Sequence, residues 1–565
     1  NDEELCKTLQ KHYFPNSMEA QVDFWENNIK SASHKLQLGI CKIGESELLG
    51  VVSLNNLDYI NRKCPRWAKK FKRVPDCPPR GVGILPETYP TLAYFLQSTN
   101  EIDFNHGYGA QVLKDINQFQ GKNAPIVFEN NDFANGYYNA SQAGNTYLRD
   151  GLIPTMTSDA RGFNLSTNTG EPDEELVGEN VLALLKDCGF QVNRTYDKAN
   201  TPPPHMGGNI ISPVPGICAT NNSKDIKAFE AYGCNKDNTI ALDPSEPNWG
   251  GVNHIDEKVS IVPNPNSRKK PPCNFSLVVQ SPEHSLKLLE HSVQVDKGDD
   301  YFFNLDEISK EGDRENGPDN SPYFSSWSDA PGVGTICKLY KEIPVDEFIP
   351  EDKKQYITEK YRVIYSNKGR NGKKIKAVVT KEELEVIEKE NSYFHVEGKV
   401  KVSSNEDMLS NEEIKNIQLS IRDKDCSKIT NADVLRVYKN QSSRIMNLQE
   451  DVDKFVAKLK DKMKETNNIC GDGSDLDIIK TPYMATNALA NSTNLIITSD
   501  RSIAYGSSLS NIFEEDLQNQ YKARGVFARP LPQIYTRLLQ YKHGHTESGG
   551  LHCLTNSIQI CKPTN

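Results

Sequence analysis

Two short segments contain residues whose types and spacing could do nucleophilic chemistry. One runs Asn253-His254-Ile255-Asp256-Glu257-Lys258, and the other runs Gly549-Gly550-Leu551-His552-Cys553. If a strand begins at His254, its alternation places His254 and Asp256 on one face, so that an imidazole and a carboxylate lie side by side. Paired glycines let the chain turn sharply and let a substrate approach closely. Together the segments predict a thiolate nucleophile, Cys553, beside a proton carrier and an anion.

The cysteine content bears on this prediction. The chain has 13 cysteines and no CxxC pair, which argues against a zinc ribbon or a thioredoxin-like motif. Scattered cysteines in a large chain indicate disulfides formed in an oxidising compartment, and the odd count leaves at least one outside intrachain pairs. Two alternatives stay open: a reduced intracellular chain, and a Cys553 that anchors a disulfide, for example with Cys561.

Other features favour a secreted protein. The chain begins with Asn1 and not Met, which is expected after removal of a signal peptide or at the edge of an expressed fragment. No run of 18 apolar residues occurs, so we expect no membrane partner. The formal net charge of −10 argues against a nucleic-acid partner. Sequons for N-glycosylation occur at Asn139, Asn164, Asn193, Asn221, Asn274, Asn440 and Asn491.

Patterning along the chain predicts an α/β fold in three parts. Residues 1–85 read as a polar, helical N-terminal extension, and residues 301–435 as a charged insertion on the surface. Residues 86–300 and 436–565 combine short apolar runs with loops rich in Gly, Pro and Asn, as expected of strands bounded by turns. A helix is predicted over 440–466, with an apolar stripe formed by Ile445, Leu448, Val452, Phe455, Val456, Leu459 and Met463.

Both segments resemble motifs of a known protein family. Residues 549–556 (Gly-Gly-Leu-His-Cys-Leu-Thr-Asn) are similar to the nucleophile motif of the protein-arginine deiminases, in the guanidino-group-modifying superfamily. Residues 254–257, followed by Ser-Ile-Val-Pro at 260–263, resemble the second signature of that family. Two further stretches agree in order and spacing, at 206–213 and 475–479.

The resemblance implies a fold and a mechanism. The fold would be a five-bladed, pseudo-symmetric α/β propeller, called a pentein, with the site at its centre. Cys553 would attack the guanidinium carbon of peptidyl-arginine, and His254 would protonate the departing ammonia and then activate water. Asp256 would hold the guanidinium by charge-assisted hydrogen bonds. The product is citrulline, and the partners are arginine-containing peptides or proteins.

The family also uses a second aspartate on the guanidinium and an arginine on the substrate backbone. Asp132 and Asp103 both precede a Gly-Tyr pair, each one residue short of the family spacing. We choose Asp132 because Arg161 follows it at a distance that suits the family's arginine. His552 is expected to be a neighbour that faces away from Cys553.

No cofactor is predicted. The animal enzymes need acidic calcium ligands where this chain has Phe133 and Ile211, and hard cations require oxygen ligands. We therefore expect calcium independence. The N-terminal part is also too short for the paired immunoglobulin-like domains of those enzymes.

Three other functions compete with this one. An enzyme of the same superfamily could act on free arginine, agmatine or a methylarginine, with residues 301–435 as its lid. A secreted binding glycoprotein could have the fold without the activity. A papain-like protease is disfavoured, because here the histidine precedes the cysteine.

Overall fold

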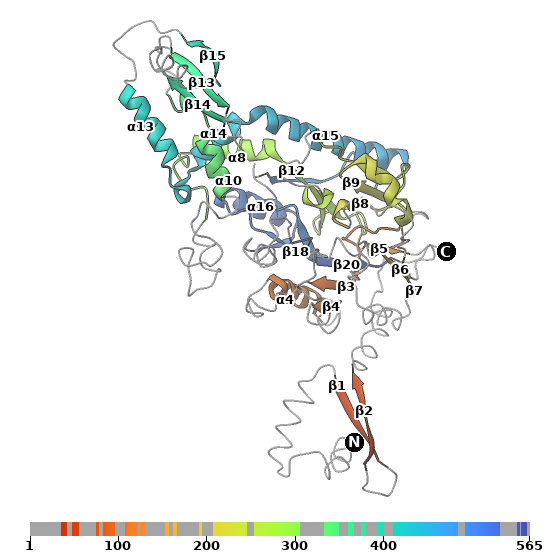
Figure 1. Ribbon diagram of the computed structural model, residues 1–565. Coiled ribbons are helices and arrows are strands. Elements are labelled where there is room, and N and C mark those ends of the chain that lie inside the picture. The colour runs from red at the N-terminus through yellow and green to blue at the C-terminus, as the bar shows by residue number, and fades with distance from the viewer. Residues whose placement is uncertain are drawn as a thin grey trace, which may run out of the picture.

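The chain combines helices with small sheets, none of which closes on itself in the part of the chain described (Figure 1). The computed structural model describes residues 35–41, 48–55, 75–77, 83–96, 108–121, 125–129, 153–156, 162–166, 191–194, 207–245, 254–304, 333–349, 360–366, 374–379, 394–400, 411–483, 492–531, 551–553 and 555–561.

Five three-stranded sheets share one pattern within these residues. In each, the middle strand is antiparallel to one neighbour and parallel to the other. The strands, sheet by sheet, are β20 (Thr555–Gln559), β3 (Thr91–Leu96) and β4 (Ile126–Glu129); β5 (Ile153–Met156), β6 (Gly162–Ser166) and β7 (Gln191–Arg194); β8 (Ile210–Val214), β9 (Ile217–Thr220) and β10 (Thr239–Ala241); β11 (Val259–Pro263), β12 (Phe275–Ser281) and β16 (Ile478–Pro482); β17 (Leu495–Ser499), β18 (Ser502–Gly506) and β19 (Phe527–Leu531).

The parallel pairs explain where the helices lie. Parallel neighbours need a crossover connection, whereas antiparallel neighbours can be joined by a short turn. The crossovers of three sheets carry α4 (Tyr108–Gln120), η4 (Ser223–Tyr232) and α16 (Asn511–Ala523). The crossover from β12 to β16 is far longer, and it contains the whole of residues 301–435.

β20, the last strand described, belongs to the same sheet as β3 and β4. β20 pairs with β3 in antiparallel register, and a disulfide between Cys77 and Cys561 ties the same two segments together. Arg529 on β19 forms a bidentate ion pair with the buried Asp115 on α4, at 2.6 and 2.5 Å. The strand pairing and the disulfide hold β20 in the sheet of β3, and the ion pair joins α4, in the crossover of that sheet, to the sheet of β18 (Figure 1).

The main core lies between the central sheets and one long helix. β11 and β12 are buried along their whole length, as their apolar, β-branched sequences suggest. The predicted helix is confirmed as α15 (Ser442–Glu465), which buries every residue of the predicted stripe. In Figure 1 this helix runs along the upper side of the molecule, above β12.

Residues of the predicted insertion form a second core together with its neighbours. Its described elements are α10 (Val333–Lys341), η7 (Val345–Phe348), β13 (Lys360–Ser366), β14 (Lys374–Val379), β15 (Phe394–Val400), α13 (Asn411–Arg422) and η8 (Cys426–Lys428), and α14 (Asn431–Asn440) crosses the predicted boundary. Ile336 and Val434 pack with Leu289 of α8 (Pro282–Gln294) and Phe513 of α16. A disulfide joins Cys337 to Cys426.

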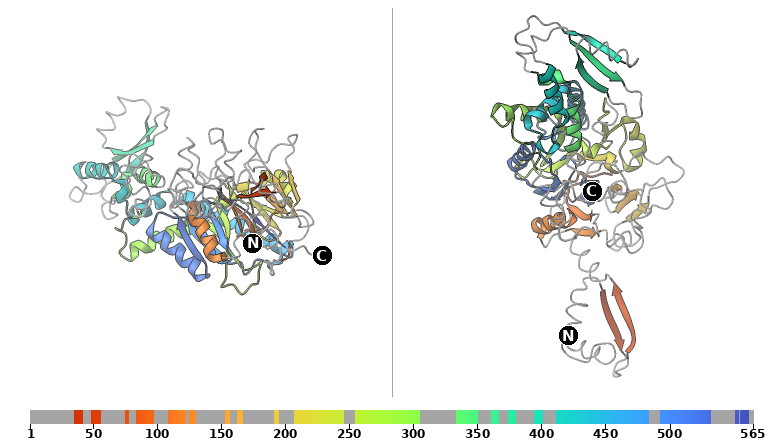
Figure 2. Two further views of the ribbon diagram at one scale, coloured as in Figure 1. Left: turned by 90° about the horizontal axis from the view of Figure 1, so that it is seen from below. Right: turned by 60° about the vertical axis from the view of Figure 1, so that its left-hand side comes forward.

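The predicted helical extension is wrong for the residues described in it. Residues 35–41 and 48–55 form two antiparallel strands, β1 (Lys35–Cys41) and β2 (Leu48–Asn55). The sequence Lys-Leu-Gln-Leu-Gly-Ile alternates polar or small residues with apolar ones, which is the period of a strand and not of a helix. In Figure 1 and the right-hand view of Figure 2, this hairpin and the β13–β15 sheet lie at opposite ends of the molecule.

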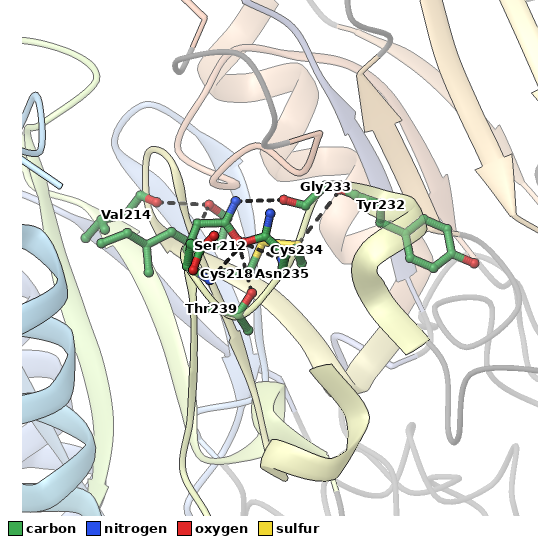
Figure 3. The surroundings of a disulfide bond; sticks show 11 residues. Ser212, Val214, Cys218, Tyr232, Gly233, Cys234, Asn235 and Thr239 are labelled. Atoms are coloured by element: carbon green, nitrogen blue, oxygen red, sulfur yellow. Dashed lines mark hydrogen bonds between the residues drawn. A yellow bond between two sulfur atoms is a disulfide. The ribbon is translucent and has the colours of Figure 1, made fainter. Parts of the chain in front are cut away.

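Disulfides also tie neighbouring elements within the sheets. Figure 3 shows the bond between Cys218 on β9 and Cys234, just beyond η4, where Gly233 ends the helix at a φ of 78°. A further bond joins Cys273 to Cys470. Four disulfides among the described residues are compatible with secretion. No helix in this part of the chain is both long and apolar enough to span a membrane.

The packing of α15 can be tested by truncating one side of the helix at a time. Phe455 is 0% exposed, so we expect Phe455→Ala to lower the free energy of unfolding by about 3–5 kcal/mol, through lost burial and a residual cavity. Met446 on the same helix is 53% exposed, and Met446→Ala serves as the control, with a change of about 0.5 kcal/mol or less. Urea unfolding followed by circular dichroism measures both. Equal effects would contradict the assigned orientation of α15.

Candidate active site

Cys553 lies in a buried turn that leads directly into β20. It is 2% exposed and takes part in no disulfide, since Cys561 is bonded to Cys77. The alternative of a structural bond between Cys553 and Cys561 is therefore excluded. The turn packs against Tyr94 and Leu96 of β3, within a small apolar cluster between two sheets. Cys553 thus has the position predicted for it, at the start of a strand.

His254 and Asp256 lie at the start of β11, but not within the strand. The prediction that a strand begins at His254 is wrong: residues 255–257 form a 3₁₀ turn, η6 (Ile255–Glu257), and β11 begins at Val259. The turn forms because the Glu257 carboxyl, three residues on, accepts a hydrogen bond from the His254 backbone N–H at 3.4 Å. The two side chains are brought together by this turn rather than by strand alternation.

The three predicted residues converge. One donor atom from each of His254, Asp256 and Cys553 lies within 4.8 Å of the other two. The Cys553 Sγ is 3.8 Å from Asp256 Oδ2. Asp256 is 0% exposed, whereas His254 is only partly buried. A thiol, an imidazole and a carboxyl group therefore share one small volume, with the imidazole closest to solvent.

Sequence reasoning missed Asn494, which holds the nucleophile's backbone. Its Oδ1 accepts hydrogen bonds from the backbone N–H of His552 at 2.6 Å and of Cys553 at 3.4 Å. Its Nδ2 lies 3.4 Å from Cys553 Sγ and donates to it. The only local signal is an asparagine directly before β17, and asparagines are common in this chain. Its role follows from a contact 59 residues away in sequence.

His552 was also misjudged. It was expected to face away from the nucleophile without a role, yet its ring shares a partner with the Cys553 thiol. His552 Nδ1 lies 2.7 Å from Asp256 Oδ2, and Nε2 lies 2.7 Å from Glu87 Oε1. The side chain is only 5% exposed. Two successive side chains of the predicted motif therefore contact Asp256.

All these residues occupy equivalent places in three different sheets. His254 and Asp256 precede β11, Asn494 precedes β17, and His552 and Cys553 precede β20. Each of these strands is antiparallel to the middle strand of its own sheet. The site is therefore formed where the starts of three equivalent strands meet.

Burial affects the ionisation of Glu257 and Lys258, at the end of η6. Desolvation raises the pKa of Glu257 and lowers that of Lys258, so burial favours the neutral form of each side chain. Lys258 Nζ donates a hydrogen bond to Asn221 Oδ1 at 2.8 Å. Asn221 N in turn donates to Asn209 Oδ1 at 3.0 Å, at the segment before β8 that resembles the family's Gly-Asn motif. This network anchors η6.

The acidic segment at 475–479 has a structural role. Burial opposes ionisation of Asp477, but hydrogen bonds from Arg524 and Ser276 keep its pKa below the ordinary value. Arg524 binds it in a bidentate manner, at 2.6 and 2.9 Å. This ion pair joins the start of β16 to the end of α16. Both carboxylate oxygens of Asp477 take part in it.

Three predicted residues lie outside the described part of the chain. These are Asp132, its alternative Asp103, and Arg161. Phe133 lies outside it as well, whereas Ile211 is a buried residue of β8. The second guanidinium-binding aspartate and the substrate-binding arginine therefore stay predictions.

The converging side chains differ from a calcium site. Calcium takes six to eight oxygen ligands, whereas this group offers one sulfur, one nitrogen and one carboxylate. A softer metal such as zinc would find suitable donor types here. This chemistry sets the controls for any assay: a chelator and calcium must both be tried.

No family model matches this chain, and no curated protein is similar to it.

The thiol state of Cys553 can be checked directly. We expect a non-reducing peptide map to link Cys77 to Cys561, Cys218 to Cys234, Cys273 to Cys470 and Cys337 to Cys426. Iodoacetamide should label Cys553 in the denatured protein without any reductant. Mass spectrometry reads both results. A Cys553 peptide released only by reduction would contradict the site.

Asn494 accepts two backbone hydrogen bonds and donates one to the Cys553 thiol, and two substitutions can test these contacts separately. We expect Asn494→Ala to lower the free energy of unfolding by about 1–3 kcal/mol, because two buried N–H groups lose their acceptor. Asn494→Asp keeps an acceptor oxygen but places a negative charge beside Cys553 Sγ, so alkylation of the thiol should be slower at neutral pH. Denaturant unfolding and the rate of iodoacetamide labelling measure these effects. Wild-type labelling of Asn494→Asp would contradict the assigned contact.

Proposed function

We propose that this protein is a secreted hydrolase that converts peptidyl-arginine to citrulline and ammonia. One observation carries the proposal: the Cys553 thiol, the His254 imidazole and the Asp256 carboxylate have donor atoms within 4.8 Å of one another in a largely buried site. A thiol needs a nearby base and a stabilising charge to act as a nucleophile. Here His254 is the nearby base. The stabilising positive charge would come from a cationic substrate, which the Asp256 carboxylate would attract.

The repeated sheet pattern of the fold supports the proposal. Five sheets of one pattern, with site residues at equivalent strand starts, are what a five-bladed α/β propeller of the pentein type requires. On this reading, residues 86–300 and 436–565 supply the blades, β20 completes the first blade, and the site lies at their common centre. Residues 301–435 are then an insertion into a single crossover, between β12 and β16.

The proposed reaction has two halves. The Cys553 thiolate forms a C–S bond to the guanidinium carbon, and His254 gives a proton to one terminal nitrogen as its C–N bond breaks and ammonia leaves. His254 then takes a proton from water, whose oxygen adds to the same carbon. The C–S bond breaks, which restores the thiolate; the added oxygen loses its remaining proton to solvent, which leaves the ureido group of citrulline. Asp256 holds the guanidinium throughout.

The assay that tests this function measures citrulline released from a benzoylated arginine peptide and from free arginine. Each substrate is tested with EDTA and with added calcium, for the wild type, Cys553→Ala and His254→Ala. We expect peptide turnover in EDTA, because the described site offers no oxygen-rich calcium group, and a loss of at least about 10³-fold in Cys553→Ala. His254→Ala should lose about 10²–10⁴-fold, as expected on removing a general acid and base.

The other results each point to a rival. Turnover of free arginine alone would assign the protein to small guanidines. Activity only with calcium would show that the cation binds in residues outside the described part. Activity abolished by EDTA and restored by zinc would favour a metal centre on the same three side chains. No citrulline under any condition, with Cys553 reactive to iodoacetamide, would favour a binding protein.

A further inference from the structure

The His552 side chain bridges two carboxylates next to the nucleophile. Nδ1 lies 2.7 Å from Asp256 Oδ2 and Nε2 lies 2.7 Å from Glu87 Oε1, both within hydrogen-bond distance. The three side chains are 0%, 5% and 18% exposed, in the order Asp256, His552, Glu87. The reaction proposed above makes no use of this bridge.

The geometry of this bridge fits a doubly protonated ring. A neutral imidazole has one N–H and can donate to only one carboxylate, whereas an imidazolium donates from both nitrogens. Carboxylates on both sides favour the positively charged ring. Among the described residues, Asp256 from η6 and Glu87 from the segment before β3 face the ring with carboxylates. The Cys553 thiol meets the same Asp256 oxygen, and His254 has a ring nitrogen within 4.8 Å of both Asp256 and Cys553.

The position of Glu87 is fixed from outside the site. It belongs to residues 83–90, where Tyr89 N donates to Pro86 O at 3.0 Å and Tyr89 Oη donates to Asp76 O at 3.2 Å. The disulfide from Cys77 holds this segment to the end of β20. Glu87 and His552 also line a small pocket of about 40 Å³, whose other walls come from Ile84, Leu85, Gly207 and residues of β8, β11 and β20. The bridge therefore lies between Cys553 and this pocket.

We propose that His552 is a positioning residue: held as an imidazolium between Asp256 and Glu87, it fixes the Asp256 carboxylate and offsets its charge beside the Cys553 thiol. The role in turnover rests on the proposed function, but the effect on the thiol does not. Without the imidazolium, the Asp256 carboxylate 3.8 Å from Cys553 Sγ would oppose formation of the thiolate.

The test uses three variants of the full chain. His552→Asn removes the charge and the link to Glu87, and Glu87→Gln removes one carboxylate at nearly constant size. His284→Asn is the matched control, because His284 Nε2 lies 2.8 Å from Asp516 Oδ2 in a pair between α8 and α16, outside the site. The rate of Cys553 alkylation by iodoacetamide is followed against pH by mass spectrometry, and thermal unfolding verifies that each variant is folded.

We expect the alkylation profile of His552→Asn to move to higher pH by about one unit, which makes labelling at pH 7 roughly tenfold slower. Glu87→Gln should move it in the same direction by less, and His284→Asn should leave it unchanged. With an arginine peptide, kcat of His552→Asn should fall about tenfold or more while KM changes less, because the Asp256 anion still attracts the cation but is no longer held in place.

Wild-type alkylation profiles in both His552→Asn and Glu87→Gln would overturn the proposal. If His552→Asn does not fold, the profile of Glu87→Gln alone decides. The alkylation readout needs no substrate, so a wild type that releases no citrulline would reject the deiminase function and leave the test of His552 intact.

Discussion

The pairing of β20 with β3 is the constraint on which the site depends. Cys553 lies about 300 residues after His254 in the sequence, and the pairing fixes the strand that follows it in the sheet of β3, which packs against β17. Loop closure over such a separation costs conformational entropy. Two contacts offset this cost: the Cys77–Cys561 disulfide, and the hydrogen bonds from the backbone of His552 and Cys553 to Asn494.

The sequence alone was sufficient to predict which residues converge where their types form an unusual motif. Two glycines before a cysteine, and a histidine two residues before an aspartate, are seldom combined by chance, and both segments meet in the structure. The stripe of α15 was equally predictable, because its period comes from local geometry. The local conformation at His254 was not, since a carboxyl three residues later turns an expected strand start into a 3₁₀ turn.

Other features could not have been found in a single sequence. Asn494, Glu87 and His552 have partners between 58 and 465 residues away. The immediate neighbours of Asn494 and Glu87 do not mark them, and His552 lies in the predicted motif but its contact with Asp256 is long-range. Likewise, the strands β1 and β2 lie in a stretch whose overall polarity suggested helix, although the alternation in residues 35–41 favoured a strand. Long-range contacts, rather than composition, distinguish site residues from ordinary loop residues here.

The electrostatics of the site favour a cationic substrate. A thiolate at Cys553 and a carboxylate at Asp256 would be two anions with atoms 3.8 Å apart in a buried site, where like charges are costly. His552 can offset part of this charge, because Glu87 on the other side of the ring favours its protonated form. A bound guanidinium would neutralise the remainder and lower the pKa of the thiol at the moment when the nucleophile is needed. A neutral or anionic substrate would leave both anions uncompensated, so under the proposed function the charge that binds the substrate would also be the charge that activates the thiol.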